Sequence, residues 1–256
     1  MMKSQILLPS IDIKKINDIS RAAGEIHMYY YSKNNIGVNY KSDNSPVTIA
    51  DTESNKFICK ELSNLYPNIP IISEENEISD IKHDIFWLID PLDGTKSFIK
   101  RKGEFTVNIG LVCNKKPIIG VVYASLSNQL YYVGSDQIPY KESLGKIKTR
   151  EAPTEGLTVL TSAFFNNNKK MNDYLKNKNI NKVINESSSL KICLIAEGSA
   201  DLYPRFGQTM EWDTAAAHAI LKAAGGSIKD FEGNDLNYGN IEKKYYNPSF
   251  IAKGYN

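Results

Sequence analysis

Two aspartates three residues apart follow a short apolar run in residues 85–98, which read Ile-Phe-Trp-Leu-Ile-Asp-Pro-Leu-Asp-Gly-Thr-Lys-Ser-Phe. The run predicts a buried strand that ends at Asp90, with Asp93 across a turn. Two carboxylates held this close repel each other unless a cation lies between them, and Mg²⁺ takes oxygen ligands of this kind. Gly94 and Thr95 add N–H groups and a hydroxyl, which suit a phosphate oxygen. Because Pro-Leu-Asp-Gly is also good turn chemistry, the segment alone fits either a metal site or a plain turn.

Further acidic positions favour the metal site. Ser73-Glu-Glu75 ends a second short strand candidate, and Asp51 lies where an extended segment meets a helix. Asp213 precedes an Ala-rich apolar run that stops at two glycines, which is typical of a helix with an acidic N-terminus. An isolated Asp213 fits a simple N-cap, but a capping carboxylate can still offer an oxygen to a metal. The sequence therefore holds enough acids for a metal centre if the fold brings them together.

Short motifs that together resemble one protein family are spread over nearly the whole chain. They are Asn44-Ser-Pro-Val-Thr-Ile-Ala-Asp51, Ser73-Glu-Glu75, Asp90-Pro-Leu-Asp-Gly-Thr95, Lys96-Ser-Phe-Ile-Lys-Arg-Lys-Gly-Glu-Phe-Thr-Val-Asn-Ile109, Ser187-Ser-Ser-Leu-Lys-Ile-Cys-Leu194, Ala196-Glu-Gly198, Leu202-Tyr-Pro-Arg-Phe-Gly207 and Glu211-Trp-Asp-Thr-Ala-Ala216. Together they resemble the inositol monophosphatase superfamily of metal-dependent, lithium-sensitive phosphatases, and within it the CysQ-type 3'(2'),5'-bisphosphate nucleotidases. Several independent motifs in one order are far more specific than a single Asp-x-x-Asp-Gly-Thr.

The resemblance implies a centre of two or three Mg²⁺ ions. One ion would be held by Glu74, Asp90 and the carbonyl of Leu92. A second would be held by Asp90, Asp93 and Asp213, so that Asp90 bridges the two. Bridging is physically reasonable because a carboxylate has two oxygens and several lone pairs.

The resemblance also implies hydrolysis by a metal-activated water, which metal ions can generate near neutral pH. Thr95 would orient the water, and either Glu74 or Asp51 would take its proton. The family pairs an acid with the threonine, which points to Asp51, but the sequence does not decide between the two acids. Glu75, the neighbouring acid, is expected to lie outside the metal shell.

A bisphosphate substrate has a second phosphate that must be held away from the metals, by cations or by helix N-terminal N–H groups. Ser188 and Ser189 open a predicted helix, with Lys191 in its first turn, and Arg205 lies further along the chain. The alternatives are a plain cap at Ser188 and solvated surface charges at Lys191 and Arg205. The predicted substrate contacts are Leu92, Asp93, Gly94, Thr95, Ser188, Ser189, Lys191, Arg205 and Asp213.

The activity that the resemblance implies is hydrolysis of adenosine 3',5'-bisphosphate to AMP and phosphate, which would clear a by-product of sulfate assimilation. Inositol monophosphate hydrolysis on the same scaffold is the nearest alternative. A non-catalytic nucleotide- or metal-binding regulator is an alternative outside catalysis. A haloacid-dehalogenase-type phosphatase places its second aspartate two residues after the nucleophile. The gap of three residues between Asp90 and Asp93 argues against that chemistry.

Two leading helices and the strands after them predict an antiparallel-rich α+β half, residues 1–145, with most of the metal ligands. A polar stretch over residues 134–155 is the best candidate boundary. Strands and helices then alternate, which predicts a C-terminal α/β half, residues 146–256, with Asp213 and the substrate contacts. The resemblance implies a layered α/β/α/β/α fold with the site between the halves. The expected helices are 11–31, 52–66, 170–178, 188–197 and 213–224, and the expected strands are 69–72, 86–89, 106–113, 117–123, 129–133, 157–162, 182–184, 200–203 and 227–229.

Bulk composition indicates a globular protein, and the resemblance implies that its partner is a small-molecule nucleotide bisphosphate. A net charge of +2 gives no basis for binding a nucleic-acid polymer. The three cysteines are expected as buried thiols in a reducing compartment. No apolar run is long enough to span a membrane, and residues 6–9 are too short an apolar stretch for a secretion signal. We therefore expect a cytoplasmic protein, monomeric or homodimeric, and the resemblance adds a weak peripheral association with the inner face of the membrane.

Overall fold

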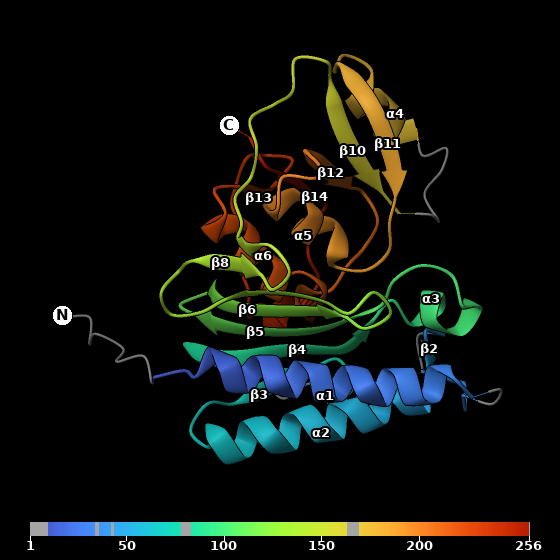
Figure 1. Cartoon of the computed structure of the whole chain (residues 1–256), viewed down its shortest axis with the longest axis vertical. Helices are drawn as coiled ribbons and strands as arrows, with labels where there is room; N and C mark the ends of the chain where they lie inside the picture. The colour runs from blue at the N-terminus through green and yellow to red at the C-terminus, as the bar shows by residue number, and fades with distance from the viewer. Residues whose placement is uncertain (1–9, 34–35, 42–43, 78–82, 163–168, 256) are drawn as a thin grey trace.

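The computed structural model describes residues 10–33, 36–41, 44–77, 83–162 and 169–255, so residues 6–9 lie outside it. The chain forms five layers, which are two long helices, a seven-stranded sheet, two short helices, a five-stranded sheet and one outer helix (Figure 1). This confirms the α/β/α/β/α arrangement that the resemblance implied.

The first layer consists of α1 (Ile13–Tyr31) and α2 (Ile49–Leu65), which lie side by side on one face of the seven-stranded sheet (Figure 1). α2 begins three residues before the predicted start at residue 52 because Thr48 caps it. The N–H and the hydroxyl of Thr48 donate to the Asp51 carboxylate at 2.8 and 2.6 Å. Asp51 therefore lies in the first turn of the helix, where the capping box fixes its side chain.

The seven-stranded sheet is antiparallel except for its first pair, β3 and β4, which is parallel. β4 runs on past Ile89 to Asp93, with a register irregularity between Asp90 and Asp93. The predicted turn at this place is therefore wrong, because an irregularity lets the strand accommodate Pro91 and still pair beyond it. The strands, in sheet order, are β3 (Ile71–Ser73), β4 (Ile85–Asp93), β5 (Thr106–Cys113), β6 (Lys116–Ala124), β7 (Gln129–Val133), β8 (Pro139–Lys141) and β9 (Gly145–Lys146).

The polar stretch that was expected to be a boundary contains the last two strands of this sheet. β8 and β9 form an antiparallel hairpin, and the next strand, β10, begins at Leu157 in the other sheet. The residues of this hairpin are polar because β8 and β9 lie at the edge of the seven-stranded sheet, where they are partly exposed to solvent. The division of the chain into halves at residue 145 stays a prediction.

The middle layer contains α5 (Leu190–Ala196) and α6 (Ala215–Ala223), which lie between the two sheets (Figure 1). α6 packs closely on β5 and β6, and a Cβ atom added at Gly120 would lie 2.1 Å from the Ala216 carbonyl oxygen. The predicted single helix over residues 213–224 is wrong at its start. Residues Glu211–Asp213 form a 3₁₀ turn, and the N-cap of α6 is Thr214.

The five-stranded sheet mixes parallel and antiparallel pairs, in the order β11-β10-β12-β14-β13. α4 (Lys169–Leu175) covers its outer face. The sequence did not predict β14, whose four residues are too few for a clear alternation. The strands are β10 (Leu157–Thr161), β11 (Ile180–Asn185), β12 (Leu202–Arg205), β13 (Ser227–Asp230) and β14 (Phe250–Lys253), and the remaining short elements are β1 (Asn39–Tyr40), β2 (Pro46–Val47), α3 (Thr95–Lys100) and η2 (Ile241–Lys243).

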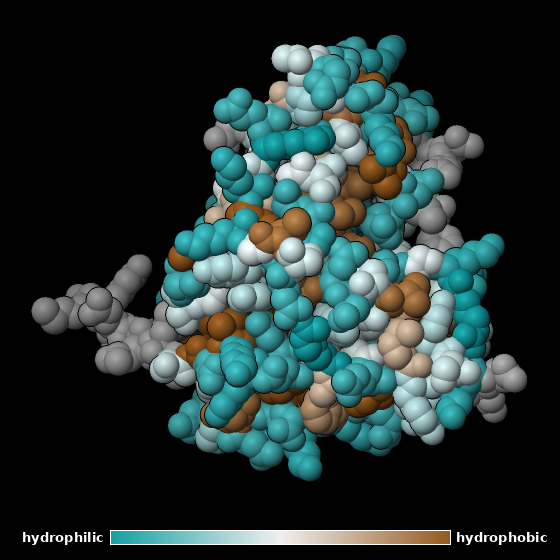
Figure 2. Space-filling model, viewed as in Figure 1, coloured by the Kyte–Doolittle hydropathy of each residue, from teal (hydrophilic) through white to brown (hydrophobic). Residues whose placement is uncertain are grey.

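The face of the molecule in Figure 2 is mostly hydrophilic, with apolar side chains scattered among polar ones. Across the residues that the structure describes, no helix has both the length and the apolar character that crossing a membrane requires. The cysteines are free thiols, but only Cys193 is buried, whereas Cys59 and Cys113 are half-buried.

Candidate active site

The predicted site residues converge on one cleft of about 390 Å³ between the end of β4 and the middle layer. The cleft is lined from one side by the segment after β3, the end of β4 and the start of α3. From the other side it is lined by the start of α5, the end of β12 and the turn before α6. The predicted residues that line it are Glu74, Asp90, Leu92, Asp93, Gly94, Thr95, Ser188, Ser189, Lys191, Arg205 and Asp213.

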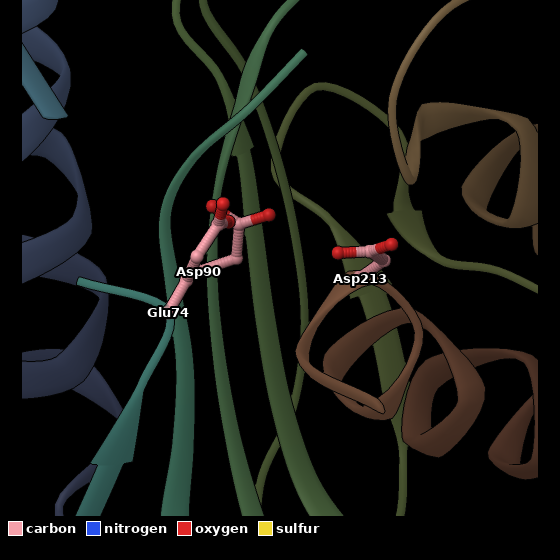
Figure 3. Close-up of side chains that lie close together, drawn as sticks. All are labelled: Glu74, Asp90 and Asp213. Carbon is pink, nitrogen blue, oxygen red and sulfur yellow. The ribbon is translucent and has the colours of Figure 1, made fainter. Parts of the chain in front are cut away.

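Three acids form the centre of this cleft. Glu74, Asp90 and Asp213 each offer a carboxylate oxygen, and these oxygens lie within 4.8 Å of one another. Glu74 and Asp90 lie together because β3 and β4 are parallel neighbours, and the Glu74 N–H donates to the Ile89 carbonyl at 3.1 Å. Asp213 faces them from the turn that precedes α6 (Figure 3).

The three acids are electrostatically unfavourable as they stand. Burial raises the pKa of Asp90 well above its ordinary value, and the charges of Glu74, Asp93 and Asp213 raise it further. Burial and the charges of Asp93 and Glu74 likewise raise the pKa of Asp213 well above its ordinary value. A hard divalent cation relieves this repulsion, and carboxylate and carbonyl oxygens are the donors that Mg²⁺ prefers. The carbonyl of Leu92, the other predicted ligand, also lines the cleft.

Asp93 lies in the same cleft but outside the group of three. Its Oδ2 accepts a hydrogen bond from the Ser189 N–H at 2.5 Å. The Ser189 hydroxyl in turn donates to Asn108 Oδ1 at 2.7 Å and lies 3.0 Å from the Thr106 hydroxyl. Asp93 therefore ties the end of β4 to the N-terminus of α5. Joint ligation of one ion by Asp90, Asp93 and Asp213 stays a prediction.

Asp51 and Thr95 form the predicted pair. The Thr95 hydroxyl lies 3.0 Å from Asp51 Oδ1 and 3.1 Å from the Leu92 carbonyl oxygen. Asp51 itself is buried behind Thr95, and burial raises its pKa despite the hydrogen bonds from Thr48 and Thr95. The arrangement places an acceptor for a proton directly behind a hydroxyl that lines the cleft.

The cationic residues of the cleft differ from each other. Lys191 is only 5% exposed, so the alternative of a solvated surface charge is wrong for it. Its Nζ donates to the Ser188 carbonyl at 2.6 Å and lies 5.2 Å from the centre of the Tyr203 ring. Burial lowers the pKa of Lys191 to about 8. Arg205 is half-buried and donates to the Gly207 carbonyl at 3.2 Å.

The start of α5 differs from the prediction of a helix from residue 188. Ser188 has a φ of +56°, which a helix does not accommodate, so α5 begins at Leu190. The Ser188 hydroxyl accepts a hydrogen bond from the Leu190 N–H at 3.3 Å, as a local cap would. Ser189 is buried and occupies the N-cap position.

A model of the inositol monophosphatase family matches residues 12–254. The chain belongs to the inositol monophosphatase family. This confirms the resemblance that the sequence motifs indicated.

Relatives within the inositol monophosphatase family are similar over almost the full chain. The 3'(2'),5'-bisphosphate nucleotidase CysQ of Buchnera aphidicola is 42% identical over 247 residues, which are 95% of this chain and 92% of the relative. The protein of the same name from Escherichia coli strain K12 is 40% identical over 250 residues, covering 95% of this chain and 100% of the relative. The crystal structure of CysQ from Bacteroides thetaiotaomicron has a TM-score of 0.80 at 34% identity, covering 95% of this chain and 97% of that one.

Sequence patterns missed Lys41, which follows β1. Its Nζ lies 2.9 Å from Glu74 Oε1 and 2.7 Å from Glu75 Oε1, so it holds both acids of this pair. Burial raises the pKa of Glu75 to about 7, although Lys41 opposes the shift. No spacing along the chain links Lys41 with these acids. The contacts of Thr106 and Asn108 with Ser189 were not predicted either. The feature that could have indicated them is the presence of two polar residues in an otherwise apolar strand.

Mg²⁺ is expected to stabilise the protein more strongly as the pH rises above about 4, the ordinary pKa of an aspartate. Without metal, the raised pKa values of Asp51, Asp90 and Asp213 mean that the fold holds protons that the unfolded chain has released above about pH 4. These bound protons favour the folded state at low pH, and this contribution to stability is lost as the pH rises through the raised pKa values of the three aspartates. A metal binds the ionised carboxylates, so its effect on Tm grows in the same window.

Thermal melts with and without saturating Mg²⁺, at several pH values, measure this difference. Buried His27 and His218, whose pKa values burial lowers to about 3, change stability in the opposite direction. They do so equally with and without metal, so the difference in Tm isolates the acids. A difference that stays constant or shrinks with pH would contradict the expectation.

Proposed function

We propose that this protein is a Mg²⁺-dependent phosphomonoesterase that hydrolyses adenosine 3',5'-bisphosphate to AMP and phosphate. The observation that carries the proposal is the convergence of Glu74, Asp90 and Asp213, with oxygens within 4.8 Å, beside the Asp51–Thr95 pair. Identity of 40% to 42% with relatives named 3'(2'),5'-bisphosphate nucleotidase supports the choice of substrate.

We propose that the acids of the cleft hold a centre of two or three Mg²⁺ ions. Glu74, Asp90 and the Leu92 carbonyl would hold one ion, and Asp90, Asp93 and Asp213 would hold another. When bound, such ions neutralise phosphate oxygens, activate water near neutral pH and stabilise the leaving oxygen. The buried and mutually repelling acids of the cleft support this proposal because a cation would lower their energy.

Thr95 and Asp51 would move the proton. The Thr95 hydroxyl donates to Asp51 and so leaves its oxygen lone pairs to orient a water molecule. Asp51 would accept the proton that this hydroxyl passes on. We propose Asp51 rather than Glu74 as the acceptor, because Glu74 is already engaged by Lys41 and by the other acids of the centre.

The remaining residues of the cleft would bind the two phosphates. The N–H groups of Gly94 and Thr95, at the start of α3, would hold the phosphate that is cleaved. Lys191, Arg205 and the Ser188–Ser189 segment would hold the second phosphate. Lys191 is suited to this role because its charge is buried and already oriented by carbonyls, so a phosphate would meet it without much reorganisation.

Replacing Lys191 with methionine is expected to lower kcat/KM for adenosine 3',5'-bisphosphate about 10- to 100-fold, which corresponds to one hydrogen bond to a charged group. Adenosine 3'-monophosphate lacks the second phosphate, so its hydrolysis should change little. Methionine keeps the length of the side chain. The exposed Lys182, changed to methionine, is the matched control and should affect neither substrate. An equal fall for both substrates would contradict the role in holding the second phosphate.

One assay tests the proposed function. Phosphate release is measured from adenosine 3',5'-bisphosphate and from inositol 1-phosphate, with and without Mg²⁺, and with Mg²⁺ plus Li⁺. We expect faster release from the nucleotide, dependence on Mg²⁺ and inhibition by Li⁺. Faster release from inositol 1-phosphate would favour the inositol monophosphatase alternative. Nucleotide binding without any release would favour a non-catalytic regulator.

The cellular setting stays a proposal as well. We propose a cytoplasmic enzyme that acts on a small nucleotide and not on a nucleic-acid polymer, in the part of sulfur metabolism that assimilates sulfate. Weak peripheral attachment to the membrane, and the choice between monomer and homodimer, stay predictions.

A further inference from the structure

Asn55, on α2, joins the two residues on either side of the segment that carries Glu74. Its side-chain oxygen accepts a hydrogen bond from the Ser73 hydroxyl at 2.7 Å, and its Nδ2 donates to Asn76 Oδ1 at 2.8 Å. The Cys59 thiol reaches the same side-chain oxygen at 3.4 Å. Asn55 is 7% exposed and Ser73 is 3% exposed, so the bond between them is shielded from water, whereas the bond to the exposed Asn76 is only partly shielded.

The backbone of this segment is held by two bonds that do not involve α2. The Glu74 N–H donates to the Ile89 carbonyl at 3.1 Å, and the Asn76 N–H donates to the Ser73 carbonyl at 3.1 Å. The first bond continues the pairing with β4, and the second closes a turn. The amide of Asn55 bonds both ends of the turn to α2, and the Asn76 amide also donates to the Cys59 sulfur of the same helix at 3.8 Å.

The same helix also carries Asp51. Asn55 lies four residues after Asp51, which places both side chains on one face of α2. Asp51 is bonded to Thr95 at one end of this face, and Asn55 holds the Glu74 segment one turn further on. Because a helix is stiff over one turn, α2 adds a second link, beside the pairing with β4, that holds the Glu74 segment relative to the Asp51–Thr95 pair.

We propose that Asn55 is a positioning residue that fixes the Glu74 carboxylate for metal binding and so sets the affinity for Mg²⁺. This role rests on the proposed function, in which Glu74 is a metal ligand. Asn55 is not among the residues that line the cleft, so it acts through Glu74 and not on the substrate. Groups that hydrogen-bond a metal ligand directly typically contribute 10- to 100-fold in metal affinity. Asn55 acts one step further away, through the residues on either side of Glu74 and Glu75, so a smaller effect is expected.

The test is Mg²⁺ binding measured by isothermal titration calorimetry on the full chain. Asn55→Leu keeps the approximate size of the side chain but removes both hydrogen bonds. It is expected to weaken Mg²⁺ binding roughly tenfold, the low end of the range for groups that contact a metal ligand directly. Ser73→Ala removes one of the bonds and should weaken binding less. The double variant should bind about as weakly as Asn55→Leu alone, because the bond between these residues is lost only once.

Kinetics separate positioning from general damage. In Asn55→Leu, the Mg²⁺ concentration for half-maximal turnover should rise by the same factor as the dissociation constant. Turnover at saturating Mg²⁺ should stay close to that of the wild type. If Asn55→Leu does not fold, as judged by circular dichroism, Ser73→Ala decides the question by the same criteria.

Asn64→Leu is the matched control, since Asn64 is an exposed asparagine on the same helix. It should bind Mg²⁺ as the wild type does. Unchanged Mg²⁺ binding in Asn55→Leu and Ser73→Ala would overturn the role of Asn55 but leave the proposed function standing. An equal loss of Mg²⁺ binding in Asn64→Leu would do the same. A wild-type protein that binds no Mg²⁺ would overturn both this role and the proposed function.

Discussion

Asp90→Asn is expected to slow phosphate release from adenosine 3',5'-bisphosphate about a thousandfold, which corresponds to about 4 kcal/mol of lost transition-state stabilisation. Asp90 offers one of three carboxylate oxygens that lie within 4.8 Å of one another, and an amide is a much poorer ligand for a divalent cation than a carboxylate. Mg²⁺ binding measured by calorimetry should be lost together with turnover.

The same variant is expected to be more stable than the wild type when metal is absent. Burial and the surrounding acids raise the Asp90 pKa, so ionised Asp90 destabilises the fold near neutral pH. Removing the charge should add roughly 0.5–2 kcal/mol, or about 2–4 °C in Tm for each kcal/mol. Asp18→Asn, at an exposed position of α1, is the control and should change neither property. Wild-type turnover or a lower metal-free Tm in Asp90→Asn would count against the metal centre.

Asp51→Asn is expected to lower turnover about 100- to 10,000-fold while leaving Mg²⁺ binding nearly unchanged, as for the loss of a general base. The amide oxygen of asparagine can still accept the bonds from Thr48, so the start of α2 should keep its cap. The carboxylate that would receive the proton from Thr95 is lost.

Comparison with Glu74→Gln decides which acid takes the proton. Glu74→Gln should lose both Mg²⁺ binding and turnover, whereas Asp51→Asn should lose turnover only. Thr95→Val should resemble Asp51→Asn, and the two changes combined should cost little more than one, because the residues act as a unit. If Asp51→Asn weakens Mg²⁺ binding as strongly as Glu74→Gln does, Asp51 is not a separate proton acceptor.

Parts of the fold were predictable because local patterns were strong. The apolar runs at Thr106–Cys113 and Gln129–Val133 match β5 and β7 residue for residue. The continuation of β4 past Asp90 was not predictable, since it depends on pairing between Asp93 and Thr106. The hairpin of β8 and β9 was missed for the same reason. Its polar residues pair through the backbone, which leaves no hydrophobic period in the sequence.

The chemistry of the site was only partly predictable. The motif around Asp90 alone fitted a turn as well as a metal site, and the resemblance to a family was needed to connect it with Glu74 and Asp213. The bonds of Lys41 to Glu74, and of Ser189 to Asp93, join residues that are distant in the chain. Pairings of this kind follow from the tertiary fold, so no spacing in the sequence indicates them.

The close packing of α6 on the first sheet has a consequence for synthesis on the ribosome. Strands β3 to β9 emerge early, but α6, which covers their inner face, and the nearby Asp213 emerge much later. A nascent chain that stops between residues 147 and 212 has the first two acids without the third. We therefore expect premature termination in that interval to leave an inactive polypeptide with an uncovered apolar sheet, which is a target for chaperones and proteases.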